Sequence, residues 1–153
     1  MKPNAETGDI FRVNLYNGSA ILGQVIQYDK RGLPGYSLGL FDLPFESHQE
    51  RTNTNLSFDK CFSILIGTTE CFSRNSNWKV IGNQNLIIPK KYYPYERLRK
   101  SNKPGCILHN KSAIDEFVNA YYGLLPWDNY YKSDYLDGML LSLEKKPLNL
   151  IYK

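Results

Sequence analysis

Two histidines, His48 and His109, are the side chains best suited to bind a metal ion or to transfer protons near neutral pH. Neither has a cysteine, a second histidine or a carboxylate at the spacing of a metal-binding motif. His48 falls in a polar stretch and His109 in a basic turn, where we expect ordinary surface histidines. The sequence therefore predicts no metal site.

The three cysteines, Cys61, Cys71 and Cys106, form no CxxC pair. Cys61 and Cys71 lie in apolar stretches, as buried thiols usually do. No local signature of a Ser–His–Asp or Cys–His site is present, and the turn at residues 32–35 lacks the ending of a phosphate-binding loop. We predict that the protein is not an enzyme and needs no cofactor, with a hydrolase site assembled from scattered residues as a minor alternative.

Charge is unevenly placed along the chain, although the net charge is only +4. Residues 61–111 carry nine Lys or Arg against two Asp or Glu, whereas residues 112–153 carry four against six. The most basic stretch, residues 90–103, alternates cations with tyrosines, the ingredients of a groove for single-stranded nucleic acid. A solvated loop whose tyrosines pack on the sheet is the favoured alternative. The candidate cations are Lys90, Lys91, Arg97, Arg99, Lys100 and Lys103.

Two acidic regions are candidates for binding a protein partner. The first is a long polar connection at residues 42–60, and the second is an aromatic stretch at residues 126–137. Tyr and Trp side chains among carboxylates suit recognition of a basic protein surface, although Trp127 is the aromatic residue most expected to fold inward. The candidate residues are Asp42, Glu46, Glu50 and Asp59 in the first region, and Trp127, Asp128, Tyr130, Tyr131 and Asp134 in the second.

The first part of the chain has the alternating pattern of β-strands. Residues 8–29 predict a hairpin, in which Asn17-Gly18 favours a type I′ turn while the register stays open. A third strand is expected at residues 36–41, one or two strands at residues 61–72, a strand ending at Gly82-Asn83, and a short strand at residues 85–88.

Helices are expected only near the end. Ser112 and Asp115 have the spacing of a capping pattern at a helix N-terminus, and apolar residues with helical spacing follow them. Gly123 is expected to end this helix. A second helix is predicted from Ser133 or Asp134 to about Leu143. With 153 residues, 42% of them hydrophobic, the chain is predicted to be one domain (1–153), β-rich over 8–90 and helical over 112–143. The fold class is α+β, mostly β, with a strongly bent antiparallel sheet or partial barrel and two C-terminal helices.

The sequence contains no apolar run near the roughly 20 residues of a membrane span, and its N-terminus lacks the apolar core of a signal peptide. The odd number of cysteines favours reduced thiols. We therefore expect a cytoplasmic protein with no membrane partner.

The opening residues 8–26, GDIFRVNLYNGSAILGQVI, together with Trp78, the Ile-Gly-Asn at residues 81–83 and Pro89, resemble the immunity protein 26 family of bacterial polymorphic-toxin systems. The resemblance covers roughly residues 8–90. It implies a mostly β cytosolic antidote that binds and neutralises a toxin domain, expected to be a nuclease effector, as in contact-dependent growth inhibition. No catalytic residues transfer from the family. The net positive charge departs from the acidic character usual for inhibitors of basic nucleases.

Steric neutralisation of a toxin domain is thus the leading hypothesis. The alternative is a module that binds RNA or single-stranded DNA through the basic segment.

Overall fold

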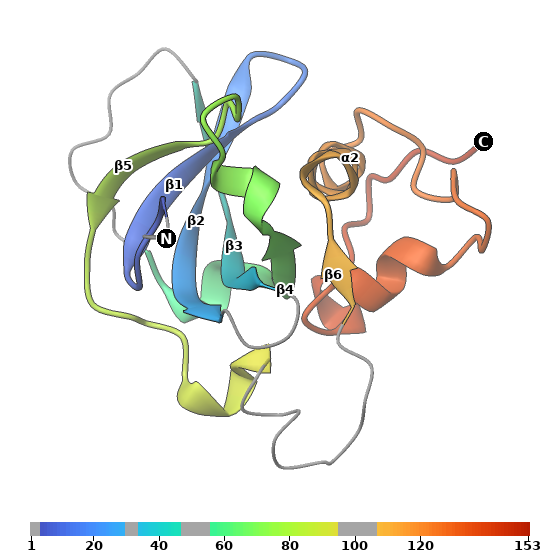
Figure 1. The fold of residues 1–153 in the computed structure, drawn as a ribbon. Helices are drawn as coiled ribbons and strands as arrows, with labels where there is room; N and C mark the ends of the chain where they lie inside the picture. Colours follow the sequence, from blue (N-terminus) through green and yellow to red (C-terminus); the bar gives the residue numbers. More distant parts are fainter. Residues whose placement is uncertain (1–3, 30–33, 47–55, 95–106) are drawn as a thin grey trace.

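A computed structural model describes residues 4–29, 34–46, 56–94 and 107–153. Six strands form one open sheet in the order β5-β1-β2-β3-β4-β6 (Figure 1). All neighbours are antiparallel except β4 and β6, which are parallel, so the prediction of an antiparallel sheet is wrong at this edge. The strands are β1 (Asp9–Asn14), β2 (Ser19–Asp29), β3 (Gly35–Glu46), β4 (Cys61–Thr68), β5 (Lys79–Asn83) and β6 (Leu108–His109).

The predicted N-terminal hairpin is confirmed, with a different turn. Gly18 N donates to Leu15 O at 3.3 Å, Leu15 N donates to Ser19 O at 2.8 Å, and Gly18 has a φ of +88°. These bonds define a three-residue loop closed by a glycine in the left-handed region, a common hairpin connection besides the two-residue type. Tyr16 therefore occupies the tip of the hairpin.

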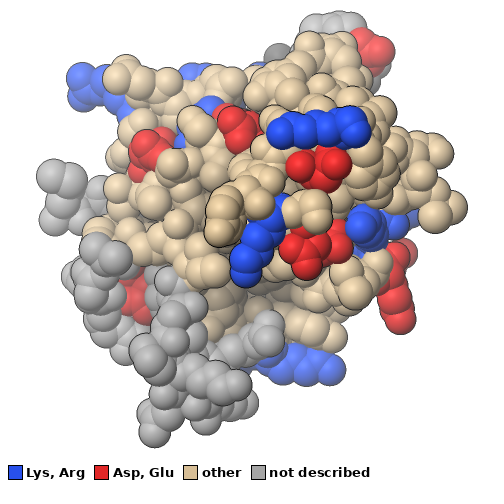
Figure 2. All heavy atoms as spheres, turned by 90° about the vertical axis from the view of Figure 1, so that its right-hand side faces the viewer, with Lys and Arg blue, Asp and Glu red and all other residues tan. Residues whose placement is uncertain are grey.

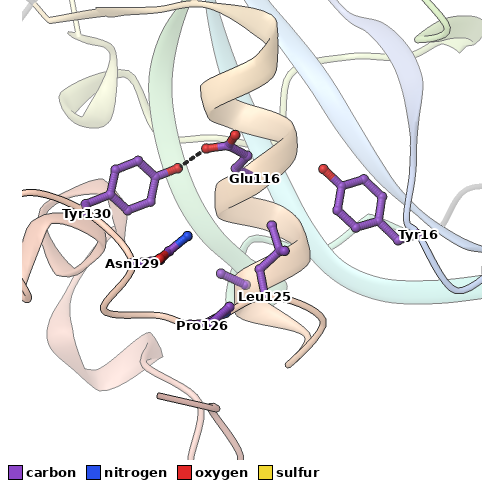
Figure 3. A pocket seen from close by; sticks show the side chains of 7 residues that line it. Tyr16, Glu116, Leu125, Pro126, Asn129 and Tyr130 are labelled. Atoms are coloured by element: carbon purple, nitrogen blue, oxygen red, sulfur yellow. Dashed lines mark hydrogen bonds between the residues drawn. The ribbon is translucent and has the colours of Figure 1, made fainter. Parts of the chain in front are cut away.

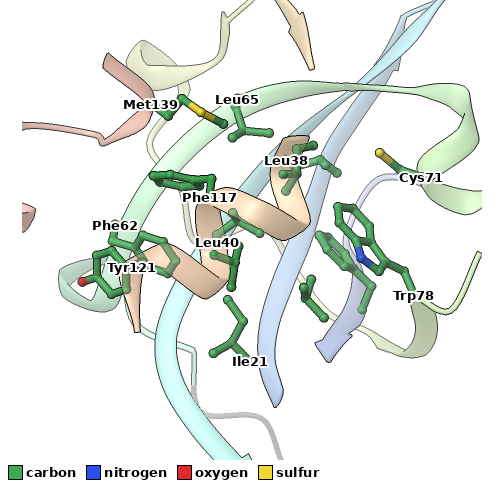
Figure 4. Close-up of a cluster of buried hydrophobic side chains, with 14 of the residues drawn as sticks. Ile21, Leu38, Leu40, Phe62, Leu65, Cys71, Trp78, Phe117, Tyr121 and Met139 are labelled. Atoms are coloured by element: carbon green, nitrogen blue, oxygen red, sulfur yellow. The ribbon is translucent and has the colours of Figure 1, made fainter. Parts of the chain in front are cut away.

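Strands β1 to β4 are buried on both faces, because alternate residues along them enter two separate hydrophobic clusters, whereas the edge strand β5 is exposed. In β1, Phe11 belongs to the larger cluster and Ile10 to the smaller one. In β2, Ile21 and Leu22 are divided in the same way. The larger cluster lies under the helix α2 (Lys111–Tyr121), as Figure 4 shows.

A close approach at Gly23 gives the first prediction. A Cβ at this position would lie 2.3 Å from Cζ of Phe11, whose ring also stacks on Trp78 with centroids 5.2 Å apart. We expect Gly23→Ala to lower the free energy of unfolding by about 1–3 kcal/mol, as overpacking usually does. Gly82→Ala is the control, since its Cβ meets nothing within 4 Å. Equal urea midpoints for the two variants would contradict the prediction.

Helix α2 carries the predicted apolar face, but it begins earlier than predicted. Asn110, not Ser112, caps the helix, since its side-chain oxygen accepts from Ala113 N at 2.7 Å. Phe117 and Tyr121 pack against Phe62 of β4, with ring centroids 5.9 and 4.0 Å away. Gly123, with a φ of +75°, follows the helix end as predicted.

The predicted second helix over residues 133–143 is wrong. Two short 3₁₀ turns, at Tyr135–Met139 and Leu143–Lys145, occupy this part of the chain. The chain bonds to β4 instead of continuing a helix: Leu141 N donates to Phe62 O at 2.8 Å, and Ser63 Oγ donates to Met139 O at 2.5 Å. In the described part of the chain, no helix is long and apolar enough to cross a membrane.

Two further expectations need correction. The polar connection expected at residues 42–60 begins later, because β3 continues through Glu46; residues 47–55 lie outside the described part. The strand expected at residues 85–88 does not form, since the buried Gln24 amide donates to the carbonyls of Gln84 and Asn85 at 3.2 and 3.1 Å. Ile88 fills the smaller cluster instead.

Candidate docking surface

Four tyrosines with exposed or partly exposed rings come from two distant parts of the chain. Tyr16 lies at the hairpin tip, and Tyr130, Tyr131 and Tyr135 follow α2. Tyr131 is 100% exposed, Tyr16 63% and Tyr135 40%. Tyr130 is partly buried, and its ring stacks on Tyr135 with centroids 5.1 Å apart. We refer to these four residues as the tyrosine group.

A buried asparagine joins the hairpin tip to α2. Asn119 is fully buried; its side-chain oxygen accepts from Tyr16 N at 2.8 Å, and its amide donates to Asp115 O at 2.8 Å. A buried amide needs such partners, so an asparagine beside the apolar face of a helix was a usable signal. Sequence reasoning missed it, and with it the contribution of Tyr16.

A pocket of about 150 Å³ lies between the hairpin tip, α2 and the segment that follows α2. Figure 3 shows the Glu116 side chain between those of Tyr16 and Tyr130. Tyr130 donates its hydroxyl hydrogen to Glu116 Oε2 at 2.5 Å. Burial and this bond both raise the pKa of Tyr130, so its phenol stays protonated as a donor. Glu116 was not among the predicted binding residues.

Trp127 belongs to the core and is not available for docking. It is 1% exposed, packs against Phe117 at 5.9 Å, and donates from Nε1 to Asp137 Oδ1 at 2.7 Å. Its inclusion among the candidate binding residues is therefore corrected, whereas the expectation that it folds inward is confirmed.

The carboxylates of the aromatic stretch are partly occupied within the protein. Asp128 accepts from Lys153 N at 2.8 Å, and Asp137 pairs with Lys146 at 3.0 Å. Asp134 is exposed. Figure 2, which faces this side of the molecule, shows acidic and basic groups scattered over a mostly uncharged surface. This side is therefore of mixed charge and less acidic than the sequence indicated.

The pairing of Asp137 predicts a pH effect on stability. Burial alone would raise its pKa, but the hydrogen bonds from Trp127 and Lys146 lower it below the ordinary 3.8. A carboxyl group whose pKa is lower in the folded state stabilises the protein above the unfolded pKa, and this stabilisation is lost as the pH falls through the folded pKa. From about pH 5 to about pH 2, we expect the free energy of unfolding to fall more steeply for wild type than for Asp137→Asn. Urea titrations that give equal slopes would contradict this.

The structure separates the members of the first acidic region. Asp42 accepts from the Tyr122 hydroxyl at 2.6 Å, beside the end of α2. Glu46 is exposed and lies opposite Ser19, next to the hairpin loop that carries Tyr16. Asp59 is exposed, and its carbonyl accepts from Lys145 at 2.7 Å. Glu50 lies outside the described residues. Glu46 is thus the member of this region that the strand register brings near the tyrosine group.

The described beginning of the basic segment packs on the sheet. Tyr92 lies 5.0 Å from Phe58, and Lys91 lies 5.2 Å from the Tyr92 ring. Tyr92 and Tyr93 both pack against the smaller cluster. For this part the packed-loop alternative is supported. Lys90 and Lys91 are exposed, and the remaining candidates, Arg97, Arg99, Lys100 and Lys103, lie outside the described residues.

The described histidine and cysteines lie in poorly reactive settings. His109 is half-buried on β6 and not in the expected surface turn, and burial lowers its pKa. Cys61 and Cys71 are fully buried, which confirms both as core thiols, and this burial raises the pKa of Cys61 to about 11 and that of Cys71 to about 12. The described residues hold no group of three His, Cys, Asp or Glu that could bind a metal; His48 and Cys106 lie outside them.

Comparison with known proteins gave no match: no protein-family model, curated protein or solved structure matches this chain. The resemblance to the immunity protein 26 family therefore remains a prediction from the sequence.

Proposed function

We propose that the protein is an immunity protein of a bacterial polymorphic-toxin system. It binds a cognate toxin domain, a nuclease effector, in the cytoplasm and blocks that domain by steric occlusion, without catalysing a reaction. The proposal rests on the sequence resemblance together with one structural observation. That observation is the tyrosine group, in which Tyr16 and Tyr130 line a pocket and Tyr131, the next residue after Tyr130, is fully exposed.

Exposed tyrosines of this kind suit binding better than folding. A lone exposed apolar residue is ordinary, but several aromatic rings around a concave site are typical of a protein-binding surface. Tyrosine loses little conformational entropy when it binds, because it has only two side-chain torsions. Asn119 fixes the hairpin tip to α2, so Tyr16 is already positioned before a partner arrives.

The surface fits a partner with basic and apolar groups. Glu116, Glu46 and Asp134 are exposed carboxylates, the first within the pocket, the second beside the hairpin loop and the third beside Tyr135 in the sequence. Such charges mainly accelerate association and select the partner, whereas buried aromatic contacts slow dissociation.

Co-expression tests the proposal. The protein is produced together with the toxin encoded beside its gene, and growth and co-purification are measured. We expect growth to be restored and the toxin to co-purify in a stoichiometric complex. If a toxic partner kills the cells at the same rate with and without the protein, and does not co-purify, the proposal is wrong.

A further inference from the structure

The pocket has the dimensions of a receptor for one side chain. Its volume is about 150 Å³, whereas a single water molecule needs only about 10–15 Å³. Its walls come from three separate segments, which are the hairpin tip, α2 and the residues after α2. Asn119 joins the hairpin tip to α2 by accepting from Tyr16 N, and Tyr130 joins the segment after α2 to the helix by donating to Glu116. The pocket is therefore formed before a ligand binds.

One charged group dominates the lining. Glu116 is the single Asp, Glu, Lys or Arg among the described residues that line the pocket. The Tyr130 hydroxyl occupies one of the roughly four acceptor positions of a carboxylate. The carboxylate thus retains capacity for donors that enter from outside. This bond also fixes the orientation of the carboxylate, so a donor meets a positioned acceptor and not a freely rotating one.

The remaining walls favour a planar cation with an aliphatic stem. Tyr16 and Tyr130 present aromatic rings, and an aromatic face attracts a nearby cation. Leu125 and Pro126 offer apolar surface for methylene groups. Asn129 adds an amide oxygen that can accept a hydrogen bond. An anion would be repelled by Glu116, and a neutral apolar group would remove water from the carboxylate without replacing its hydrogen bonds.

We infer that this pocket receives an arginine side chain of the partner protein. The guanidinium donates to Glu116 and lies against the tyrosine rings, while its methylene stem covers Leu125 and Pro126. Arginine fits better than lysine, because its flat group has five donors and stacks on aromatic faces. The identity of the partner rests on the proposed function, whereas the specificity for a guanidinium rests on the pocket alone.

The specificity can be measured without the partner. Arginine amide is titrated into the isotope-labelled full chain, and the backbone amide signals of Tyr16, Glu116 and Tyr130 are followed by NMR. We expect saturable shifts at these residues, and none with citrulline amide, which has nearly the same shape and the same α-amino group but an uncharged side chain. Glu116→Gln should weaken the binding at least tenfold. Glu144→Gln, which changes an exposed carboxylate that does not line the pocket, should leave it unchanged. Equal responses to arginine and citrulline amides, or to wild type and Glu116→Gln, would overturn the inference.

A second arm separates this inference from the proposed function. The dissociation constant of the toxin domain is measured for wild type and for Glu116→Gln, and we expect it to rise at least tenfold in the variant. If the toxin domain binds both proteins equally, the inference that a toxin arginine occupies the pocket is wrong, while the proposed function stands. If it does not bind wild type at all, the proposed function is wrong, and the arginine of a toxin is excluded as the occupant.

Discussion

Trp127→Ala is expected to lower the free energy of unfolding by about 3–5 kcal/mol, which is typical of deleting a large buried aromatic side chain. Trp127 is among the largest fully buried side chains, and it lies between Phe117 of α2 and the carboxylate of Asp137. Its backbone N also donates to Ile151 O at 2.8 Å, so this position ties the last residues to the core. Urea denaturation followed by circular dichroism gives the measurement.

Trp127→Phe is the matched control. It keeps an aromatic ring in the site but removes the Nε1 donor to Asp137, and we expect a smaller loss of about 1–3 kcal/mol. Under conditions in which this variant is folded, its affinity for the partner should equal that of wild type, because the indole is buried. Wild-type stability in Trp127→Ala would contradict the assignment of this residue to the core. Weakened binding in a folded Trp127→Phe would show that it contributes to docking.

Tyr131→Ala is expected to weaken binding of the toxin domain by about 2 kcal/mol, or about 30-fold in the dissociation constant. The loss should appear mainly as faster dissociation, since truncation of an interface residue acts chiefly on the off-rate. Stability should change by less than about 0.5 kcal/mol, because the side chain is fully exposed. Surface plasmon resonance on the folded variant measures both rate constants.

Val80→Ala controls for the loss of any exposed apolar side chain. Val80 lies on β5, the edge strand farthest in sheet order from β6, which leads into α2 (Figure 1). The Val80→Ala variant should bind the toxin domain with wild-type affinity. A dissociation rate raised equally in both variants would mean that the contact surface is not confined to the tyrosine group.

Local signals predicted much of the sheet. The alternation around residues 8–29 identified the hairpin because strand period and a turn-forming Asn-Gly agree there. The sequence also predicted the apolar face of α2 from Ile114 to Tyr121. The start of that helix was not predicted correctly, because Ser112 and Asn110 are comparable capping residues and the local sequence does not rank them. Asp115, expected to complete the Ser112 signal, instead accepts from Trp78 Nε1 at 2.9 Å.

Hydrogen bonds and contacts between distant segments determine the parts of the fold that local sequence patterns did not predict. The apolar spacing of residues 135–143 predicted that Tyr135, Leu136, Met139, Leu140 and Leu143 point inward. Leu136, Met139 and Leu140 are buried, whereas Tyr135 and Leu143 are exposed. The buried residues reach the core from 3₁₀ and irregular backbone, because Met139 and Leu141 bond to β4. The parallel pairing of β6 with β4 joins residues about 40 positions apart, and sequence period carries no information on it. The pocket was missed for the same reason, since Tyr16 and Glu116 meet only in the folded chain.

One binding experiment tests most directly whether the toxin domain docks on the tyrosine group or on the basic segment. The toxin domain is immobilised, and two folded double variants are compared with wild type by surface plasmon resonance. Tyr131→Ala with Glu116→Gln alters the tyrosine group and its pocket, whereas Lys90→Glu with Lys91→Glu reverses the described part of the basic segment. We predict that the first double variant loses most of the affinity and that the second retains it. Wild-type binding by the first variant, together with loss of binding by the second, would contradict the account and place the docking face on the basic segment.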